Sequence, residues 1–240
     1  MPIIEIYNDY ADVGVNARQI TKGEEFEMVS SFLDYRKQSF KEKPEKQLAI
    51  FLETKINNAY PDIVFAEYNP FLFEKWSNSR DKLNLFDIKL LYYIYSTRYV
   101  TTKKIIKTLS VSYRELLCSI EKLLDADLII RQKGYWIMHN RNVFGVKNIE
   151  AFEAKINNWE KVMQQALINK SFASESFILT KKKTEPNPGI VQKTMDFGIG
   201  LYICTDKGFS KVSAAQKRKF PINYNSIYIN EFIGRILNKS

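Results

Sequence analysis

The sequence contains a single histidine, His139, and only two cysteines, Cys118 and Cys204, in 240 residues. Histidine-based triads, histidine metal clusters and histidine general bases therefore have little support. The two cysteines lie in unrelated segments without CxxC or Cys/His ligand spacing, which indicates free thiols in a reducing compartment. We expect a cytoplasmic protein whose chemistry depends on other side chains.

The chain also lacks the signatures of nucleotide-driven chemistry and of membrane insertion. No GxxxxGK[ST] or GxGxxG motif occurs, because Gly198-Ile199-Gly200 lacks the third glycine. No apolar stretch approaches the length of a membrane span, and the first residues, MPIIEIYNDYADVG, have no basic start before an apolar core. We therefore expect no membrane partner and no secretory signal.

Positive charge is in excess, since 36 Lys and Arg residues face 27 Asp and Glu residues, and the isoelectric point is about 9.3. This balance favours polyanions such as nucleic acid, which basic side chains bind through phosphate contacts and counterion release. A solvated lysine surface is an equally good explanation of the charge alone. With 14 Tyr and 16 Phe, the chain is aromatic-rich and should fold as an ordered globular protein.

The segment before residue 70 predicts a helix followed by a hairpin. Residues 24–37 place apolar side chains at helical spacing and glutamates in the first turn, where the helix dipole favours anions. Residues 46–55 fit either a helix or a buried strand. We prefer a strand, because a turn and a second apolar strand at 61–68 follow and would complete a hairpin.

Residues 84–140 have a different pattern, with three amphipathic helices and then two short strands joined at a glycine. The helices are expected over 85–95, 102–109 and 113–124, and the strands over 128–131 and 135–138. This order resembles a winged helix-turn-helix domain, which lays its third helix in the major groove of duplex DNA. By that resemblance, the DNA contacts would come from Lys103, Lys104, Lys107, Ser110, Ser112, Tyr113, Arg114 and Lys133.

A protein-binding module is the alternative for this segment. The third helix and the residues after it carry Glu115, Glu121, Asp125 and Asp127, which would oppose a DNA backbone. The basic side chains are suited to phosphate contacts and carry no pattern from which a base sequence can be read.

The most informative run is residues 149–161, IEAFEAKINNWEK, which reads as a strand followed at once by a helix. Alternate side chains on a strand share a face, so Glu153 and Lys155 should lie side by side. Upstream, Asp62 offers a second carboxylate at the start of another apolar strand. Two carboxylates and an amine would suit metal-dependent phosphodiester cleavage. The alternative is a solvated Glu–Lys pair, since such triplets are common on strands.

The rest of the chain predicts alternating helices and strands. A helix should begin at Asn157 or Asn158 and reach about residue 169, and with Asn157 as the cap Glu160 would complete a capping box. Buried strands are expected at 172–179 and 198–205, and a final helix at 226–238.

Asp62, the triplet Glu153-x-Lys155, the helix with Trp159 and Gln165-Ala166, and the strand at 172–179 together resemble the PD-(D/E)XK nuclease superfamily. The resemblance covers about residues 24–68 and 149–205. It implies an α/β restriction-endonuclease-like fold, a mixed sheet flanked by helices. The domain organisation would be a nuclease-like core at 1–78 and 146–240, with a winged helix-turn-helix domain inserted at 79–145. In the family the two motifs are usually separated by a short hairpin, and an insertion at a surface turn costs little closure entropy.

The resemblance also implies a function: a Mg²⁺- or Mn²⁺-dependent endonuclease acting on DNA, expected to be double-stranded, in defence or mobile-element biology. Asp62 and Glu153 would hold the metal, and Lys155 would position the attacking water or stabilise the transition state. Gln165 would orient groups nearby, and Glu27 is the candidate acid of the preceding helix. Glu53, Lys55 and Glu67 flank Asp62 and are rival site residues, because a register slip of one position would exchange which of them faces inward.

Two further classes stay open at this point. A non-catalytic DNA-binding regulator or adaptor could keep a nuclease-like scaffold, and a structural subunit could use the helical module to bind another protein. The sequence leaves both a monomer and a homodimer open.

Overall fold

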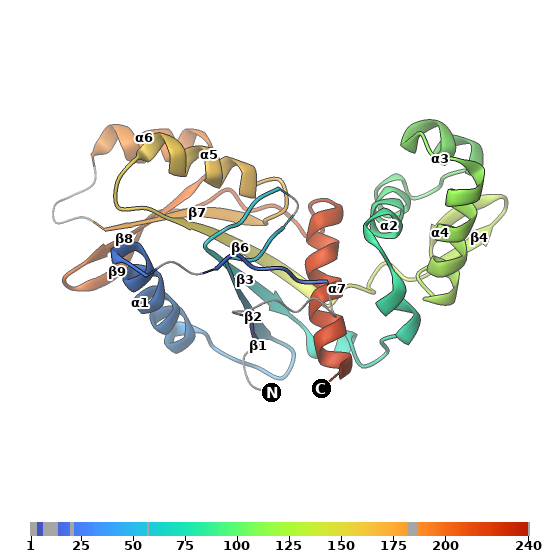
Figure 1. Cartoon of the computed structure of the whole chain (residues 1–240), viewed down its shortest axis with the longest axis horizontal. Helices are drawn as coiled ribbons and strands as arrows, with labels where there is room; N and C mark the ends of the chain where they lie inside the picture. Colours follow the sequence, from blue (N-terminus) through green and yellow to red (C-terminus); the bar gives the residue numbers. More distant parts are fainter. Residues whose placement is uncertain (1–3, 7–13, 20–21, 57, 182–186, 240) are drawn as a thin grey trace. The chain divides into compact units, whose positions relative to one another are not determined.

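The computed structural model describes residues 4–6, 14–19, 22–56, 58–181 and 187–239 (Figure 1). The chain is a mixed α/β protein that folds as two compact units. The first unit combines Met1–Asn69 with Val146–Ile222, and the second combines Pro70–Gly145 with Asn223–Ser240.

A mixed sheet of seven strands organises the first unit, in the order β1-β2-β3-β6-β7-β8-β9. The centre of the sheet is antiparallel across β2, β3 and β6, and then parallel across β6, β7 and β8. Its edges are a parallel β1 and an antiparallel β9. The strands are β1 (Ile4–Ile6), β2 (Gln47–Leu52), β3 (Ile63–Tyr68), β6 (Val146–Ala154), β7 (Glu175–Lys181), β8 (Gly200–Thr205) and β9 (Gly208–Ser213).

One face of this sheet is covered by α1 (Glu24–Ser39) (Figure 1). Phe32 of α1 is fully buried, with its ring centroid 5.0 Å from that of Phe152 on β6 and 5.2 Å from that of Tyr202 on β8. Such tilted and edge-on aromatic contacts add about 0.5–1.5 kcal/mol each to the burial of apolar area. The aromatic core fixes α1 across the middle of the sheet.

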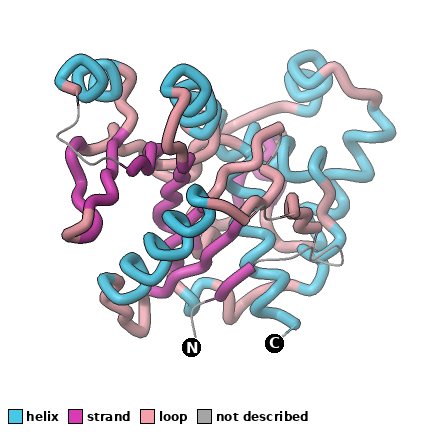
Figure 2. The backbone as a smooth tube through the Cα atoms, turned by 60° about the vertical axis from the view of Figure 1, so that its left-hand side comes forward, coloured by secondary structure: helices cyan, strands magenta, loops and turns pink. Residues whose placement is uncertain are grey.

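The opposite face is covered by α5 (Trp159–Asn169) and α6 (Pro188–Asp196), so helices lie on both sides of the strands (Figure 1, Figure 2). Alternate residues of β7 and β8, such as Ile178 and Leu201, point to this side and pack against Val162 of α5. Each central strand is buried on both faces, which explains its nearly continuous apolar sequence.

The second unit is helical with a small two-stranded sheet. Helices α4 and α7 pack against α2, and the hairpin is tied to the chain between α2 and α3 by two backbone hydrogen bonds between Val100 and Trp136. The elements are the short 3-10 helices η2 (Pro70–Leu72) and η3 (Asn78–Lys82), the helices α2 (Leu85–Thr97), α3 (Thr102–Leu109), α4 (Tyr113–Asp125) and α7 (Tyr224–Lys239), and the strands β4 (Ile129–Gln132) and β5 (Tyr135–Met138).

The C-terminal helix α7 belongs to this second unit, and this corrects the expected assignment of residues 146–240 to the sheet-containing core. The reason is a buried ion pair: Arg80 of η3 donates two hydrogen bonds to Glu231 of α7, at 2.6 and 3.0 Å. The two side chains are 3% and 0% exposed, and Arg80 also stacks on the Trp76 ring at 3.9 Å. Sequence periodicity predicts the helix α7, but it does not predict that Arg80 binds this helix.

Most predicted elements are confirmed, including the strand at 47–52 where a helix was the alternative. The helix α6 and the strand β9 were not predicted. Asn187 caps α6 by accepting a hydrogen bond from the Gly189 N–H. Pro188 occupies the first helical position, where proline favours the start of a helix. The cap of α5 is Asn158, which accepts from the Lys161 N–H, so the capping box expected from Asn157 does not form.

Among the helices of the described residues, none has both the length and the apolar content needed to cross a membrane.

The Arg80–Glu231 pair gives a stability prediction. Replacing Glu231 by Ala leaves a buried guanidinium unpaired, and we expect the free energy of unfolding to fall by about 3–5 kcal/mol. Urea denaturation monitored by circular dichroism measures this change. Glu121→Ala, which removes an exposed carboxylate from α4, is the matched control and should change stability by less than about 0.5 kcal/mol. A Glu231→Ala protein as stable as the control would show that the pair does not hold α7.

Candidate active site

The two predicted metal-binding carboxylates, Asp62 and Glu153, are neighbours across the β3–β6 ladder. Ile63 pairs with Phe152 in antiparallel register, which sets Asp62 beside Glu153 one step further along. The Ala154 N–H donates a hydrogen bond of 2.6 Å to Asp62 Oδ2. The residues are 91 positions apart in the sequence, and strand pairing alone brings them together.

Glu153 is buried behind Asp62, on the side of the sheet that faces α5. Its side chain is 2% exposed, and Oε1 accepts a hydrogen bond of 2.7 Å from Asn169 Nδ2. Oε2 is also buried, and no described residue donates to it. Burial, followed by repulsion from Asp62, raises the pKa of Glu153 to about 8.

Asp62 has a perturbed pKa as well. Burial is the main cause, repulsion from Glu53 adds to it, and together they raise the pKa of Asp62 to about 7. The hydrogen bond from Ala154 and the positive charge of Lys155 act in the opposite direction without cancelling this rise. A pair of carboxylates that repel each other in a buried place favours bound protons or a bound cation.

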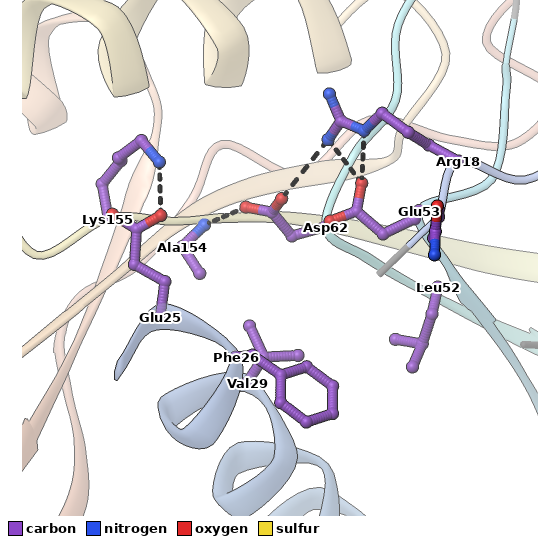
Figure 3. Close-up of a pocket in the computed structure, with 10 residues that line it drawn as sticks. Arg18, Glu25, Phe26, Val29, Leu52, Glu53, Asp62, Ala154 and Lys155 are labelled. Atoms are coloured by element: carbon purple, nitrogen blue, oxygen red, sulfur yellow. Dashed lines mark hydrogen bonds and ion pairs between the residues drawn. The ribbon is translucent and has the colours of Figure 1, made fainter. Parts of the chain in front are cut away.

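Asp62 opens into a pocket of about 350 Å³ between the strand ends and the first turn of α1 (Figure 3). The charged side chains that line this pocket are Arg18, Glu25, Glu53, Asp62 and Lys155. Phe26, Val29 and Leu52 form its apolar wall. Glu153 does not line the pocket, so Asp62 is the member of the carboxylate pair that faces the pocket.

Glu53 is the rival carboxylate that the structure brings to the pocket, whereas Lys55 and Glu67 do not line it. Its backbone φ is 48°, an unusual left-handed conformation for a residue other than glycine. The Arg18 N–H donates to the Glu53 carbonyl at 2.8 Å, and the Arg18 guanidinium forms an ion pair with its carboxylate. Backbone strain held in place by such contacts is common at functional sites.

Lys155 does not share a face of β6 with Glu153, which corrects that prediction. The strand ends at Ala154, and the Lys155 ammonium forms an ion pair with Glu25 on α1 (Figure 3). The charge of Lys155 still acts on Asp62 across the pocket. A strand that ends one residue earlier than expected therefore changes the partner of this amine.

Glu25, rather than the predicted Glu27, is the acid that α1 brings to the pocket. The Glu27 side chain is exposed and lies on the solvent side of the helix. Glu25 lies one turn before the buried Val29 and therefore on the same face of α1. The buried face of this helix could thus have identified Glu25 from the sequence.

Gln165 is half-buried on α5, and among the described residues it makes no hydrogen bond to Asp62, Glu153 or Lys155. Asn169, one turn later on the same helix face, is the amide that contacts Glu153. Because Gln165 and Asn169 are four residues apart on one helix face, the sequence could have identified Asn169 as a second candidate amide.

The residues predicted to bind DNA are all exposed. Three lysines lie on α3, Tyr113 and Arg114 occupy the first turn of α4, and Lys133 lies at the β4–β5 turn with φ of 49°. Ser112 caps α4 by accepting from the Glu115 N–H, and its hydroxyl donates to the Glu115 carboxylate at 2.7 Å. The Ser112 side chain therefore already has structural partners. The lysines are Lys103, Lys104 and Lys107.

The carboxylates fit a hard divalent cation in donor chemistry, because Mg²⁺ and Mn²⁺ bind oxygen ligands. The buried Oε2 of Glu153, which lacks a donor, and the raised pKa values of both acids indicate that the site favours added positive charge. Within the described part of the chain, no three Asp, Glu, His or Cys side chains are already assembled as metal ligands. The protein side of such a site would therefore be Asp62 and Glu153, with water completing the shell.

Comparisons of the chain with protein-family models, with curated proteins and with solved structures found no match.

The raised pKa values predict a pH-dependent stability. Both acids bind protons more tightly in the folded than in the unfolded protein, so stability is greatest below pH 4 to 5 as far as these groups are concerned. It is lost as pH rises through 7 to 8. The double variant Asp62→Asn/Glu153→Gln should therefore be more stable than the parent at pH 8.5 in EDTA, by on the order of 2 kcal/mol or more.

At pH 5 this advantage should be much smaller, because the folded parent then carries both protons and the pH is close to the pKa values of the two carboxyls in the unfolded chain. Chemical denaturation at the two pH values measures the difference. Glu160→Gln, at an exposed position on α5, is the control and should show no such pH dependence. A double variant with the same advantage at both pH values would contradict the raised pKa values.

Proposed function

We propose that this protein is a Mg²⁺- or Mn²⁺-dependent phosphodiester hydrolase that acts on DNA. The observation that carries the proposal is the pair Asp62 and Glu153, held together by the β3–β6 ladder, with Asp62 and Lys155 lining one pocket and Glu153 buried behind Asp62. Two mutually repelling carboxylates beside an amine favour chemistry on a phosphate through a cation, rather than a merely structural role.

The order of the elements supports a restriction-endonuclease-like fold. A helix, two antiparallel strands, a strand with the second carboxylate, a crossover helix and a parallel strand are the core of the PD-(D/E)XK superfamily that the sequence resembles. In this chain the corresponding elements are α1, β2, β3, β6, α5 and β7. The connection between β3 and β6 contains residues 69–145, yet the two strands pair as direct neighbours.

For this reaction Asp62 and Glu153 would hold the metal, which would supply a water of lowered pKa and polarise the phosphate oxygens. Asn169 orients Glu153 through its hydrogen bond to Oε1, and the Ala154 N–H orients Asp62. Lys155 exchanges Glu25 for the substrate and stabilises negative charge on the phosphate or positions the attacking water.

We further propose that α2, α3, α4 and the β4–β5 hairpin form a winged helix-turn-helix module that binds duplex DNA. The pairing of Val100 with Trp136 supports this, because it anchors the hairpin to the connection between the first two helices. The DNA contacts would be made by exposed side chains of α3, of the first turn of α4 and of the hairpin turn. Ser112 would contribute through helix capping rather than through its own contact.

A non-catalytic DNA-binding regulator is the second candidate function. The ion pairs at the pocket favour it, because Lys155 is bound by Glu25 and Arg18 lies 4.0 Å from Asp62 while bound to Glu53. These side-chain cations already offset part of the acidic charge. The regulator would bind DNA in a salt-sensitive manner and would not cut it.

Cleavage assays separate the two candidates. Plasmid, linear and single-stranded DNA are incubated with the protein in EDTA, Mg²⁺ or Mn²⁺, and we expect metal-dependent cutting of duplex DNA. Lys155→Ala should lower the cleavage rate by about 10²–10³-fold, because it removes positive charge next to the reacting phosphate. Asp62→Asn and Glu153→Gln should lower it at least as much.

The matched control for Lys155→Ala is Lys161→Ala, at an exposed lysine six residues further along. It should cleave like the parent, and all of these variants should bind DNA with nearly unchanged affinity in EDTA. Undiminished cleavage by Lys155→Ala would refute its role, and binding without cleavage in every metal would favour the regulator.

The helical module gives a separate prediction for DNA affinity. Replacing Lys103, Lys104 and Lys107 by Ala should reduce the slope of log affinity against log salt by up to roughly 3, about 0.9 for each phosphate that the protein no longer neutralises. Fluorescence anisotropy with duplex DNA across a salt series measures this slope. The control triple variant is Lys161→Ala/Lys193→Ala/Lys207→Ala, which removes three exposed lysines from the other unit. Equal reductions of the slope in both triple variants would show that net charge alone drives binding.

A further inference from the structure

The first unit contains a second cavity, of about 400 Å³, near the C-terminal end of α1. Glu67 of β3 and Glu150 of β6 line it, whereas Asp62 and Lys155 at the other ends of these strands line the first pocket. The second cavity therefore uses none of the residues assigned to the proposed hydrolase site.

The floor of this cavity carries a polar atom without a partner. Asn148 is 9% exposed and donates through Nδ2 toward Glu150 Oε1 at 3.5 Å and Glu175 Oε2 at 3.3 Å. Its Oδ1 is buried, and none of the described residues donates to it. A buried carbonyl oxygen left without a donor is destabilising, and a ligand N–H that reached it would satisfy it.

Arg36 supplies unused donors to the same cavity. Its guanidinium lies 4.7 Å from the Phe65 ring centroid and donates one hydrogen bond of 2.6 Å to Glu150 Oε2. No other acceptor among the described residues binds this guanidinium, which carries five N–H groups. Arg36 can therefore bind an anionic or carbonyl oxygen while it keeps its ion pair.

Aromatic walls and a lysine complete the cavity. Tyr35, Phe40 and Tyr202 line its sides, and their rings offer stacking surface to a planar group. Lys46 is paired with Glu67 at 2.9 Å. Lys41 is exposed at the mouth and forms no ion pair with a described residue, so its charge is free for a ligand.

We propose that this cavity binds a nucleotide, with the base against Asn148 and Arg36 beside the aromatic side chains and the phosphate at Lys41. The carboxylates of Glu150 and Glu175 flank the floor and exclude a phosphate from it, while they favour the N–H groups of a base. The charges at the mouth have the opposite preference. The volume also falls within the usual range of small-molecule pockets, about 300–1,000 Å³.

Two sources would supply this chemistry: a free mononucleotide, or an unpaired nucleotide at the end of a nucleic-acid strand. Isothermal titration of the full chain in EDTA tests both, with AMP, GMP, CMP and UMP, and with a duplex that carries one unpaired 3′ nucleotide. Adenosine and ribose 5-phosphate are the matched fragments of AMP. At least one of the four mononucleotides should bind. If AMP binds, its affinity should be at least about tenfold higher than that of adenosine, which lacks the phosphate, or of ribose 5-phosphate, which lacks the base.

Variants locate the binding. Lys41→Ala should weaken the binding of that mononucleotide about tenfold without affecting its nucleoside, whereas Lys43→Ala, at an exposed lysine outside the cavity, should leave both unchanged. Asn148→Leu should weaken the nucleotide and the nucleoside alike, and its melting temperature controls for folding. Asp62→Asn should have no effect, which separates this site from the proposed hydrolase pocket.

Stronger binding of the overhang than of the mononucleotides identifies a strand end as the source, and the reverse identifies a free nucleotide. Absence of binding by every mononucleotide and by the overhang at millimolar concentration would overturn the proposal. Binding that Lys41→Ala and Asn148→Leu both leave unchanged, or that Asp62→Asn abolishes, would overturn it as well. None of these results depends on whether the protein cleaves DNA.

Discussion

The antiparallel pairing of β3 with β6 is the constraint on which the candidate site depends. The register that sets Ile63 opposite Phe152 also sets Asp62 beside Glu153, and it directs the Ala154 N–H to the Asp62 carboxylate. A slip of one residue would move every side chain of β6 to the other face of the sheet and separate the two acids. Such a slip would also remove Phe152 from the aromatic core below α1 and Glu153 from Asn169 of α5, so the packing of the core and the geometry of the site depend on the same register.

The long connection between these strands is compatible with that constraint. Closing a longer loop costs entropy only with the logarithm of its length, roughly 0.6 kcal/mol for each doubling. The second unit is compact by itself and contains a buried ion pair between Arg80 and Glu231. Because the chain returns to this unit as α7, it passes between the two units at residues 69–70, at 145–146 and again at 222–223.

The sequence predicts those parts of the fold that local periodicity determines. Helices α1 to α5 and α7 were predicted because their apolar residues recur with the helical period, and the central strands because they are short, nearly continuous apolar runs. Contacts between distant segments could not be predicted in this way: the Glu25–Lys155 pair, the Asn169–Glu153 hydrogen bond and the assignment of α7 each depend on tertiary packing. The shift from Glu27 to Glu25 and from Gln165 to Asn169 is a matter of two or four positions on a predicted helix. Arg18 had no periodic context at all.

The charges around Asp62 show how this fold holds a buried acidic pair. Arg18 and Lys155 approach from opposite sides, yet each is already bound to another carboxylate, Glu53 and Glu25, so neither forms a close pair with Asp62 (Figure 3). The acidic pair is therefore only partly compensated, as the raised pKa values of Asp62 and Glu153 reflect. A fold that needed these acids only for stability would gain by pairing them fully, or by replacing them with apolar residues of similar volume. Retaining two repelling acids, next to a residue with a left-handed backbone at Glu53, costs stability that a ligand with positive charge would restore.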